Sequence, residues 1–521
     1  MKVSSLKIKF PAVSNVLLAL LSACLLILSF PDFEFSFLAW VALVPLFAAV
    51  EREKESRLRA FFTGWIFGTI FFFGTCWWLT YAPIHYAAFP PALAYLLMFC
   101  VALTVGIFPG IFCALFSILL KRLGNYAIFA APFLWTFIEF LRFWVTGNDW
   151  NAIGYSQAFN SLLVKFGSYG GVLLVSFICS AFNAFYTYPI VKRTKNSGWF
   201  ALIPLLFLLF ILLKGPDLPK GVGGNGTDVI AVQPNVPMSG IKYEERATFR
   251  ERHVQLAEEA LQQIDKDEVV FERPRVIIFP ESPMMFFYSE DAEFREFLKR
   301  FASENNAFVL FNSAEPDANS RQYFNSAVMV DQNGEKIAQY DKIHLLPFGE
   351  FQPLPEFIAS NIPGFVGNFS FGDEYDLLPF GNAKAGTMIC FESHFGLLSR
   401  EYVRRGADFL IEMTNDGYLG KTPVLRQHLA NSVFRAVETN RPLIRVTNVG
   451  VTAYIDERGE VSDEAGVYTE AARVWPVSKS DGSQTFYVRY GEWFAWLCSA
   501  VSLVLLLFSF LGKFSTEKGE A

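Results

Sequence analysis

Two kinds of hydrophobic pattern divide the chain. Residues 11–214 are almost entirely apolar runs with short polar breaks, and residues 492–512 form one more apolar run. Residues 215–490 have the mixed pattern of a water-exposed globular protein. Because a helix needs roughly 20 apolar residues to cross the hydrocarbon core of a bilayer, the pattern predicts a membrane protein with one large polar domain inserted before its last span.

The apolar runs predict eight transmembrane helices. The first run follows the basic residues Lys2, Lys7 and Lys9, as in a signal peptide, but no small-residue cleavage site comes after it. We therefore interpret it as an uncleaved anchor. The expected spans lie near residues 12–30, 36–50, 60–82, 91–119, 126–145, 161–190, 198–214 and 492–512.

Basic clusters predict the orientation of these spans, since Lys and Arg stay on the cytoplasmic side in short loops. The clusters lie at the N-terminus, at 51–59, 121–122 and 192–195, and in the C-terminal tail. With eight spans, all five clusters fall on one side of the membrane. We therefore expect both termini in the cytoplasm and residues 215–490 outside.

The polar domain mixes strand and helix patterns. Buried-strand patterns occur at 228–236 and 275–282, separated by an amphipathic helix at 244–265. Asn333-Gly334 is a strong turn signal and predicts a hairpin. The mixture indicates an α/β or α+β domain.

Charge and histidine spacing narrow the possible partners. The net charge of −6 argues against a nucleic-acid partner. The five histidines show no spacing typical of metal ligands, so we expect no metal and no cofactor.

One cysteine stands apart from the others. Six of the seven cysteines lie in apolar runs, and only Cys390, in "GTMICFESHF", belongs to the polar domain. Stray thiols in an oxidising compartment risk wrong disulfides. Cys390 is therefore either a small buried hydrophobe or a nucleophile, which needs a base and a charge-stabilising partner nearby.

Two further candidates follow predicted strands, as Cys390 does. Glu281 follows "VIIFP", and Lys342 follows "KIAQYD". Carboxyl ends of buried strands are where α/β proteins build their sites. A carboxylate can take the thiol proton, and an ammonium can lower the thiol pKa and stabilise an oxyanion. Each residue alone has an ordinary interpretation as surface charge; the combination indicates a site.

Three motifs carry a resemblance to a known family. "FPES", "YDKIHLLPFGEF" and "CFES" resemble the motifs of the nitrilase superfamily, which uses a Glu-Lys-Cys triad in an αββα sandwich. Together with eight expected spans, they make the chain similar to the apolipoprotein N-acyltransferases, the membrane-embedded branch of that superfamily. Further matching stretches are 38–46, 139–142, 154–157, 415–420, 427–428, 435–442 and 447–453.

The resemblance implies a fold class and a domain division. The expected fold is a membrane α-helical bundle of about eight transmembrane helices plus an α/β nitrilase-like αββα sandwich. Residues 1–214 would be a membrane domain with seven transmembrane helices, and 215–490 an extracytoplasmic nitrilase-like catalytic domain. Residues 491–521 would supply the C-terminal transmembrane helix and a cytoplasmic tail.

The resemblance also implies a reaction. Cys390 would attack the sn-1 ester of a phospholipid, with Glu281 as base and Lys342 at the oxyanion, to give a thioester. The α-amine of the N-terminal S-diacylglyceryl cysteine of an apolipoprotein would then take the acyl chain, completing lipoprotein maturation with ping-pong kinetics. The implied partners are the phospholipid, the apolipoprotein and the membrane. The resemblance also implies a location in the bacterial inner membrane, with the catalytic domain on the periplasmic side. The default expectation for the oligomeric state is a monomer.

Further positions match the family less uniformly. Glu350 and Glu392 match supporting glutamates. Phe391 stands where the family often has Tyr, and Tyr243 stands near a family Trp that binds substrate.

The long segment 345–375 is rich in Phe, Pro and Gly. Loops of this length are usually functional or disordered, and aromatic residues beside a membrane favour contact with lipid. We interpret it as a lipid-facing lid, with Phe365 and Phe369 as contacts; the alternative is a loop that packs on its own domain.

Two other functions are consistent with parts of the pattern. A membrane-tethered nitrilase-type amidase would share the triad and transfer acyl groups to water. A transporter or receptor with an external binding domain would need no triad. Only Glu139 and Arg142 resemble charges of a transport path, and their i, i+3 spacing lets them simply pair with each other.

Overall fold

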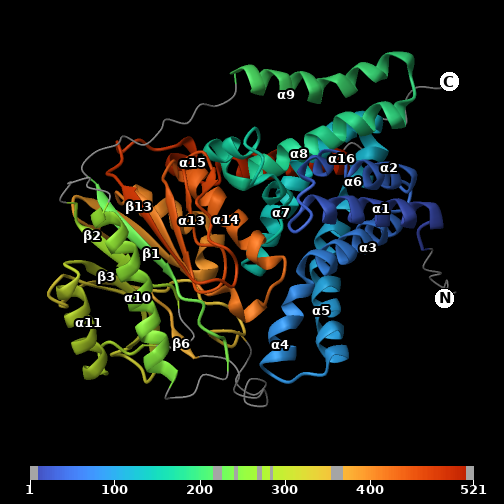
Figure 1. Ribbon diagram of the computed structural model, residues 1–521. Helices are drawn as coiled ribbons and strands as arrows, with labels where there is room; N and C mark the ends of the chain where they lie inside the picture. The colour runs from blue at the N-terminus through green and yellow to red at the C-terminus, as the bar shows by residue number, and fades with distance from the viewer. Residues whose placement is uncertain are drawn as a thin grey trace, which may run out of the picture. The chain divides into compact units, whose positions relative to one another are not determined.

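The computed structural model describes residues 10–214, 226–239, 245–266, 273–281, 286–353 and 368–511 (Figure 1). The chain forms two compact units. The first comprises Met1–Ile84, Phe89–Asp217 and Glu492–Ala521, and the second comprises His85–Ala88 and Leu218–Gly491.

The first unit is helical. In the described part of the chain, four helical stretches are long and apolar enough to cross a membrane: Arg57–His85, Pro91–Thr146, Val164–Lys192 and Trp493–Leu511. Val13–Ser29 and Ser197–Leu213 are apolar but shorter. The α-helices are α1 (Val13–Ser29), α2 (Val44–Arg52), α3 (Arg57–Cys76), α4 (Tyr81–His85), α5 (Pro91–Val105), α6 (Ile107–Leu123), α7 (Ala131–Thr146), α8 (Gly167–Lys192), α9 (Ile203–Lys214) and α16 (Trp493–Leu511).

Several expected spans differ from single straight helices; in the span expected at 161–190, for example, α8 is kinked at Gly170 and Gly171. The span expected at 36–50 consists of a 3-10 helix, Ser36–Trp40, followed after a turn by α2. The span expected at 91–119 is divided at Gly106 into α5 and α6. Pro109 explains this division, because a proline has no N–H for the carbonyl of residue 105 and its ring crowds the preceding turn.

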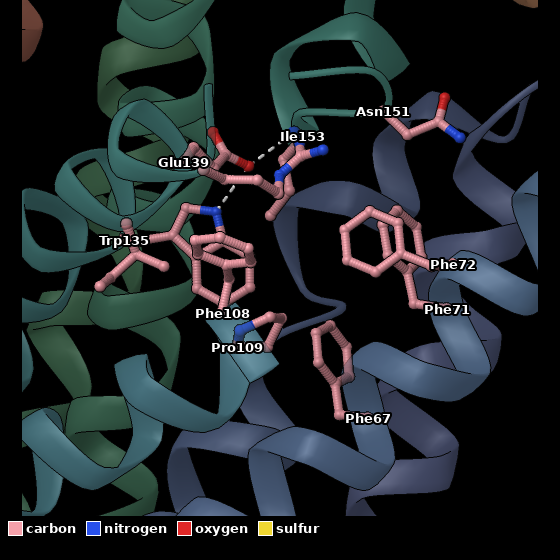
Figure 2. Close-up of a pocket in the computed structure, with 11 residues that line it drawn as sticks. Phe67, Phe71, Phe72, Phe108, Pro109, Trp135, Glu139, Asn151 and Ile153 are labelled. Atoms are coloured by element: carbon pink, nitrogen blue, oxygen red, sulfur yellow. Dashed lines mark hydrogen bonds between the residues drawn. The ribbon is translucent and has the colours of Figure 1, made fainter. Parts of the chain in front are cut away.

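Glu139 and Arg142 line a small pocket in the first unit (Figure 2). Each of them forms a hydrogen bond with the segment that follows α7. Glu139 Oε1 accepts hydrogen bonds from Trp135 Nε1 at 2.8 Å and from the Ile153 backbone N–H at 2.9 Å. Arg142 Nη1 donates to the Trp150 carbonyl at 3.0 Å. The other lining residues are Phe67, Phe71, Phe72, Phe108, Pro109, Ile138 and Asn151.

The second unit contains two β-sheets. In the described residues, the first sheet has the order β13-β1-β2-β3-β4-β5, with β6 beside β4, and the second has the order β12-β11-β10-β9-β8-β7. The strands are β1 (Thr227–Gln233), β2 (Arg275–Ile278), β3 (Phe308–Pro316), β4 (Tyr323–Val330), β5 (Lys336–Asp341), β6 (Phe369–Ser370), β7 (Leu377–Phe380), β8 (Ala383–Ile389), β9 (Phe409–Thr414), β10 (Leu443–Thr447), β11 (Ala453–Ile455), β12 (Val461–Ser462) and β13 (Ala471–Val477).

Helices cover the outer faces of the two sheets. Helices α10 (Glu245–Lys266) and α11 (Ala292–Glu304) lie beside β1, β2 and β3, and α13 (Gly396–Arg404) and α14 (Val424–Thr439) cover the second sheet (Figure 1). Between the sheets, Thr447 Oγ1 of β10 donates to Gln233 Oε1 of β1 at 3.0 Å. The layers therefore run helix, sheet, sheet, helix, in agreement with the nitrilase-like α/β domain that was predicted.

The predicted hairpin is confirmed. Strands β4 and β5 pair antiparallel, and Gly334 in the turn has φ of +77°, which glycine adopts without strain. Asp331 Oδ1 accepts hydrogen bonds from the backbone N–H groups of Asn333 and Glu335. The turn brings the chain back along β5 and so places Lys342 directly after this strand.

Close packing of α13 on β8 generates a first prediction. A Cβ added at Gly386, in β8, would lie 2.5 Å from Tyr402 Cβ and Cγ, and Tyr402 is fully buried. Gly386→Ala should therefore lower the stability of the second unit by about 1–3 kcal/mol, as overpacking does. The thermal unfolding midpoint of the detergent-solubilised protein measures this.

Gly198→Ala is the matched control, since a Cβ at Gly198 meets no atom within 4 Å. Equal midpoints for the two variants would contradict the packing argument.

Candidate functional site

The three residues singled out by their strand ends meet in the second unit. Glu281 follows β2, Lys342 follows β5, and Cys390 begins the 3-10 helix η7 (Cys390–His394) directly after β8. The Glu281 carboxyl interacts electrostatically with both Lys342 and the Cys390 thiol. Because β2 and β5 belong to one sheet and β8 to the other, facing of the two sheets brings these groups together.

Lys342 is buried and bound by a carboxylate. Its side chain is 1% exposed, and its Nζ donates to both oxygens of Glu350, at 2.8 and 2.7 Å. Burial lowers the pKa of Lys342, but Glu350 and Glu281 more than offset this, so the pKa lies above its usual value. Lys342 is consequently a fixed ammonium, suited to stabilising negative charge that develops beside it.

Asn325 of β4 links the two carboxylates on either side of Lys342. Its Nδ2 donates to Glu281 Oε1 at 3.1 Å and to Glu350 Oε1 at 2.6 Å. Asn312 Nδ2 donates to Asn325 Oδ1 at 2.7 Å and so fixes the orientation of the amide. Burial raises the pKa of Glu281, while Lys342 lowers it. A carboxylate whose pKa is raised in this way is better matched to accepting a proton near neutral pH.

Cys390 has an unusual backbone conformation for a non-glycine residue, with φ of +54°. Such a conformation costs free energy and persists only when the surroundings enforce it. Burial raises the pKa of the Cys390 thiol well above its ordinary value, and Glu281 raises it further, whereas Lys342 lowers it. The thiol is therefore protonated at rest, and an acceptor such as Glu281 must take its proton before it can act as a nucleophile.

Glu392 is fully buried and joins the segments that carry Lys342 and Cys390. Its Oε1 accepts from Tyr340 OH at 2.7 Å and from the backbone N–H groups of Ile343 and His344 at 2.8 and 3.0 Å. Its Oε2 accepts from the Ile389 N–H at 2.8 Å. Burial raises the pKa of Glu392 to about 7, against the effect of Lys342 and of these hydrogen bonds. These contacts tie the segment after β5 to the segment around Cys390.

The predicted substrate contacts are only partly within the described residues. Tyr243 and Phe365, together with residues 354–367 of the predicted lid, lie outside them. Phe369 begins the short strand β6, paired with Tyr323 of β4, and so belongs to the sheet. The Phe391 ring packs against His394 and Phe395, with centroids 5.7 and 5.2 Å away.

A buried ionic cluster lies behind Cys390 and was not assigned a role from the sequence. It consists of Glu412 in β9, Asp416, His428 in α14 and Arg445 in β10. One available signal was the presence of Glu412 and Arg445 within the apolar runs "FLIEMT" and "LIRVT". Among the described residues, no group of three or more His, Cys, Asp and Glu side chains could hold a metal ion.

Comparison with known proteins defines first the class and then the family. Residues 229–478 match the carbon-nitrogen hydrolase family, so the two-sheet unit with Cys390 belongs to that class. Residues 22–185 match the apolipoprotein N-acyltransferase N-terminal domain. The chain is 30% identical to an apolipoprotein N-acyltransferase of Geobacter metallireducens, over 96% of both chains. It therefore belongs to the apolipoprotein N-acyltransferase family.

A second relative resembles nearly the whole chain, and a solved structure resembles about half of it. An apolipoprotein N-acyltransferase of Thermotoga maritima is 29% identical over 97% of this chain and 95% of its own. Among solved structures, a variant of the Nesterenkonia AN1 amidase from the nitrilase superfamily is 17% identical, with a TM-score of 0.37 over 52% of this chain and 95% of that chain.

The four donors around Glu392 generate the second prediction. Glu392→Gln keeps the volume but turns an N–H₂ group toward backbone or hydroxyl donors, whichever way the amide is oriented. We expect a loss of about 1–3 kcal/mol in stability, because buried donors lose their acceptor. Thermal unfolding in detergent measures it.

Glu401→Gln on α13 serves as control. Glu401 pairs with the exposed side chains of Arg404 and Arg405, and such surface pairs contribute about 0–1 kcal/mol. If the two variants unfold at the same temperature, Glu392 does not hold the two segments together.

Proposed function

We propose that the protein transfers a fatty acyl chain from the sn-1 position of a phospholipid to the α-amine of the N-terminal S-diacylglyceryl cysteine of apolipoproteins. The observation that supports this most directly is the meeting of Cys390, Glu281 and Lys342 in a unit inserted into an apolar helical chain. Membership of the apolipoprotein N-acyltransferase family supports the choice of substrates. The proposed catalytic residues are these three, with Glu350 and Glu392 in supporting positions.

In the first half-reaction, Glu281 takes the proton of the Cys390 thiol and the thiolate attacks the ester carbonyl. Lys342 stabilises the oxyanion of the tetrahedral intermediate, and Glu350 keeps Lys342 in place. The intermediate collapses with cleavage of the ester C–O bond, and the proton held by Glu281 passes to the departing lysophospholipid oxygen. A thioester between the acyl chain and Cys390 remains.

In the second half-reaction, the α-amine of the diacylated lipoprotein attacks the thioester carbonyl. Glu281 now accepts a proton from the amine, the C–S bond breaks, and the thiolate regains a proton. The product is an amide. Because one substrate leaves before the next reacts, the kinetics are ping-pong.

The same proposal includes a topology. Residues 1–214 supply seven transmembrane helices and 491–521 an eighth, with both termini in the cytoplasm. Residues 215–490 then lie on the periplasmic side of the bacterial inner membrane, where both lipid substrates present their reactive groups. Five basic clusters on one side of such an arrangement support it.

Mass spectrometry of the intact protein after mixing with phospholipid tests the nucleophile. We expect one acyl adduct, located at Cys390, which an S-diacylglyceryl peptide discharges. Cys390→Ser should fold but lose at least about 10³-fold in turnover, since removing a nucleophile abolishes most catalysis. Cys24→Ser, on α1, should behave as wild type. Near-normal transfer by Cys390→Ser would refute the assignment, and discharge of the adduct only by water would indicate an amidase.

The roles of Glu281 as base and of Lys342 as oxyanion partner can be distinguished from general effects of substitution in this unit. Glu281→Gln and Lys342→Met should each block formation of the acyl adduct itself, because both groups act before the thioester exists. The adduct is measured in a single turnover. Glu304→Gln and Lys384→Met make the same two changes at exposed residues of the same unit. These control variants should form the acyl adduct normally. Normal adduct in either test variant would remove that residue from the first half-reaction.

A further inference from the structure

The cluster behind Cys390 contains two carboxylates, a guanidinium and an imidazole, all buried. Arg445 Nη2 donates to Asp416 Oδ2 at 2.7 Å, and Arg445 Nη1 contacts Glu412 Oε1. His428 Nδ1 lies 2.7 Å from Asp416 Oδ1. His428 Nε2 lies 3.0 Å from Glu412 Oε1 and 3.1 Å from the carbonyl oxygen of Cys390. The imidazole thus connects the cluster to the backbone of Cys390.

These contacts define the charge of His428. Both ring nitrogens face oxygen atoms of carboxylates or of a carbonyl, which only accept hydrogen bonds. A neutral imidazole has one N–H and one acceptor nitrogen, so it would leave one nitrogen facing an oxygen without a proton. The imidazolium donates on both sides.

The charge balance agrees with this assignment. Glu412 and Asp416 bring two negative charges and Arg445 one positive charge, so a cationic His428 makes the cluster neutral, which a buried site requires. Burial lowers the pKa of His428, but Asp416 and Glu412 raise it despite the opposing Arg445, to about 9. Burial raises the pKa of Glu412, but Arg445 and His428 reduce it to about 2.

We propose that His428 is a positioning residue, held as an imidazolium by Asp416 and Glu412, which fixes the Cys390 carbonyl and thereby keeps the left-handed backbone that aims the thiol at Glu281 and Lys342. The Cys390 φ of +54° needs an enforcing contact, and the His428 hydrogen bond supplies one at that peptide. The proposal deepens the proposed function and rests on Cys390 as its nucleophile.

The test compares His428→Gln with His253→Gln. His253 is also a buried histidine of the second unit, and its Nδ1 lies 2.6 Å from the Phe249 carbonyl in α10. Two rates are measured at Cys390 by peptide mass mapping: alkylation by iodoacetamide and acylation by phosphatidylglycerol in detergent micelles. This lipid has no amine that titrates in the pH range used. We expect both rates to fall about 10²-fold in His428→Gln, as for a misplaced reacting group, and neither to change in His253→Gln.

A pH profile separates positioning from general damage. The charged groups around His428 are Asp416, Glu412 and Arg445, with the Cys390 thiol beyond the carbonyl. In wild type, acylation should decline as the pH rises through about 9, where His428 loses its second proton. His428→Gln should lack that decline. Equal rates in His428→Gln and wild type, or an unchanged decline, would overturn the proposal.

The readouts distinguish failure of the inference from failure of the proposed function. If wild type is not acylated but its alkylation still depends on His428, the proposed function fails and the positioning role stands. If His428→Gln does not fold, ¹⁵N NMR of the wild-type histidine rings decides, with the signal of His428 assigned by replacing the other four histidines in turn. Two protonated ring nitrogens at pH 8 support the proposal, and a neutral ring refutes it.

Discussion

A single buried carboxylate, Glu392, joins the two sheets at the point where the site forms. Lys342 follows a strand of one sheet and Cys390 follows a strand of the other. The hydrophobic contacts between two packed sheets are non-directional. Four hydrogen bonds to one carboxylate are directional and short. They set the spacing between the ammonium and the thiol more strictly than apolar packing does.

Several charged side chains are buried near the site, and each lies beside a side chain of opposite charge. Lys342 lies between Glu350 and Glu281, and the cluster around His428 pairs two anions with two cations. A buried charge without a partner costs several kcal/mol or more, whereas pairing with good hydrogen bonds offsets most of that cost. Removing one member of such a group therefore affects the rest, and changes in neighbouring charges should not add independently.

Much of the second unit could be predicted from the sequence. Predicted strands followed by Glu281, Lys342 and Cys390 indicated a site at strand ends, and the Asn333-Gly334 turn indicated the hairpin; the strands and the hairpin are as the structure has them. Contacts formed between distant strands could not be predicted. Asn325 gives no local signal of its bonds to two glutamates, and His428, although it lies in a stretch that matches the family, gives no local signal of its carboxylate partners. The division of the span expected at 91–119 at Gly106 could not be predicted either, because hydropathy does not register where a proline interrupts the backbone bonds.

The pairing of Arg445 with Glu412 has a consequence for how the second sheet assembles. The two residues lie opposite each other in neighbouring parallel strands, β10 and β9, whose other residues are apolar except for the paired Thr447 and Thr414. Apolar parallel strands can align in several ways with similar burial, since a Val or Leu fits many neighbours. A slip of two residues would keep every side chain on its own face but would separate the guanidinium from the carboxylate, with one of them opposite a leucine and the other opposite a threonine. The ion pair therefore favours the correct register of β9 and β10 during folding. Misaligned intermediates would have to bury unpaired charges, whereas the correct pairing buries a neutralised pair.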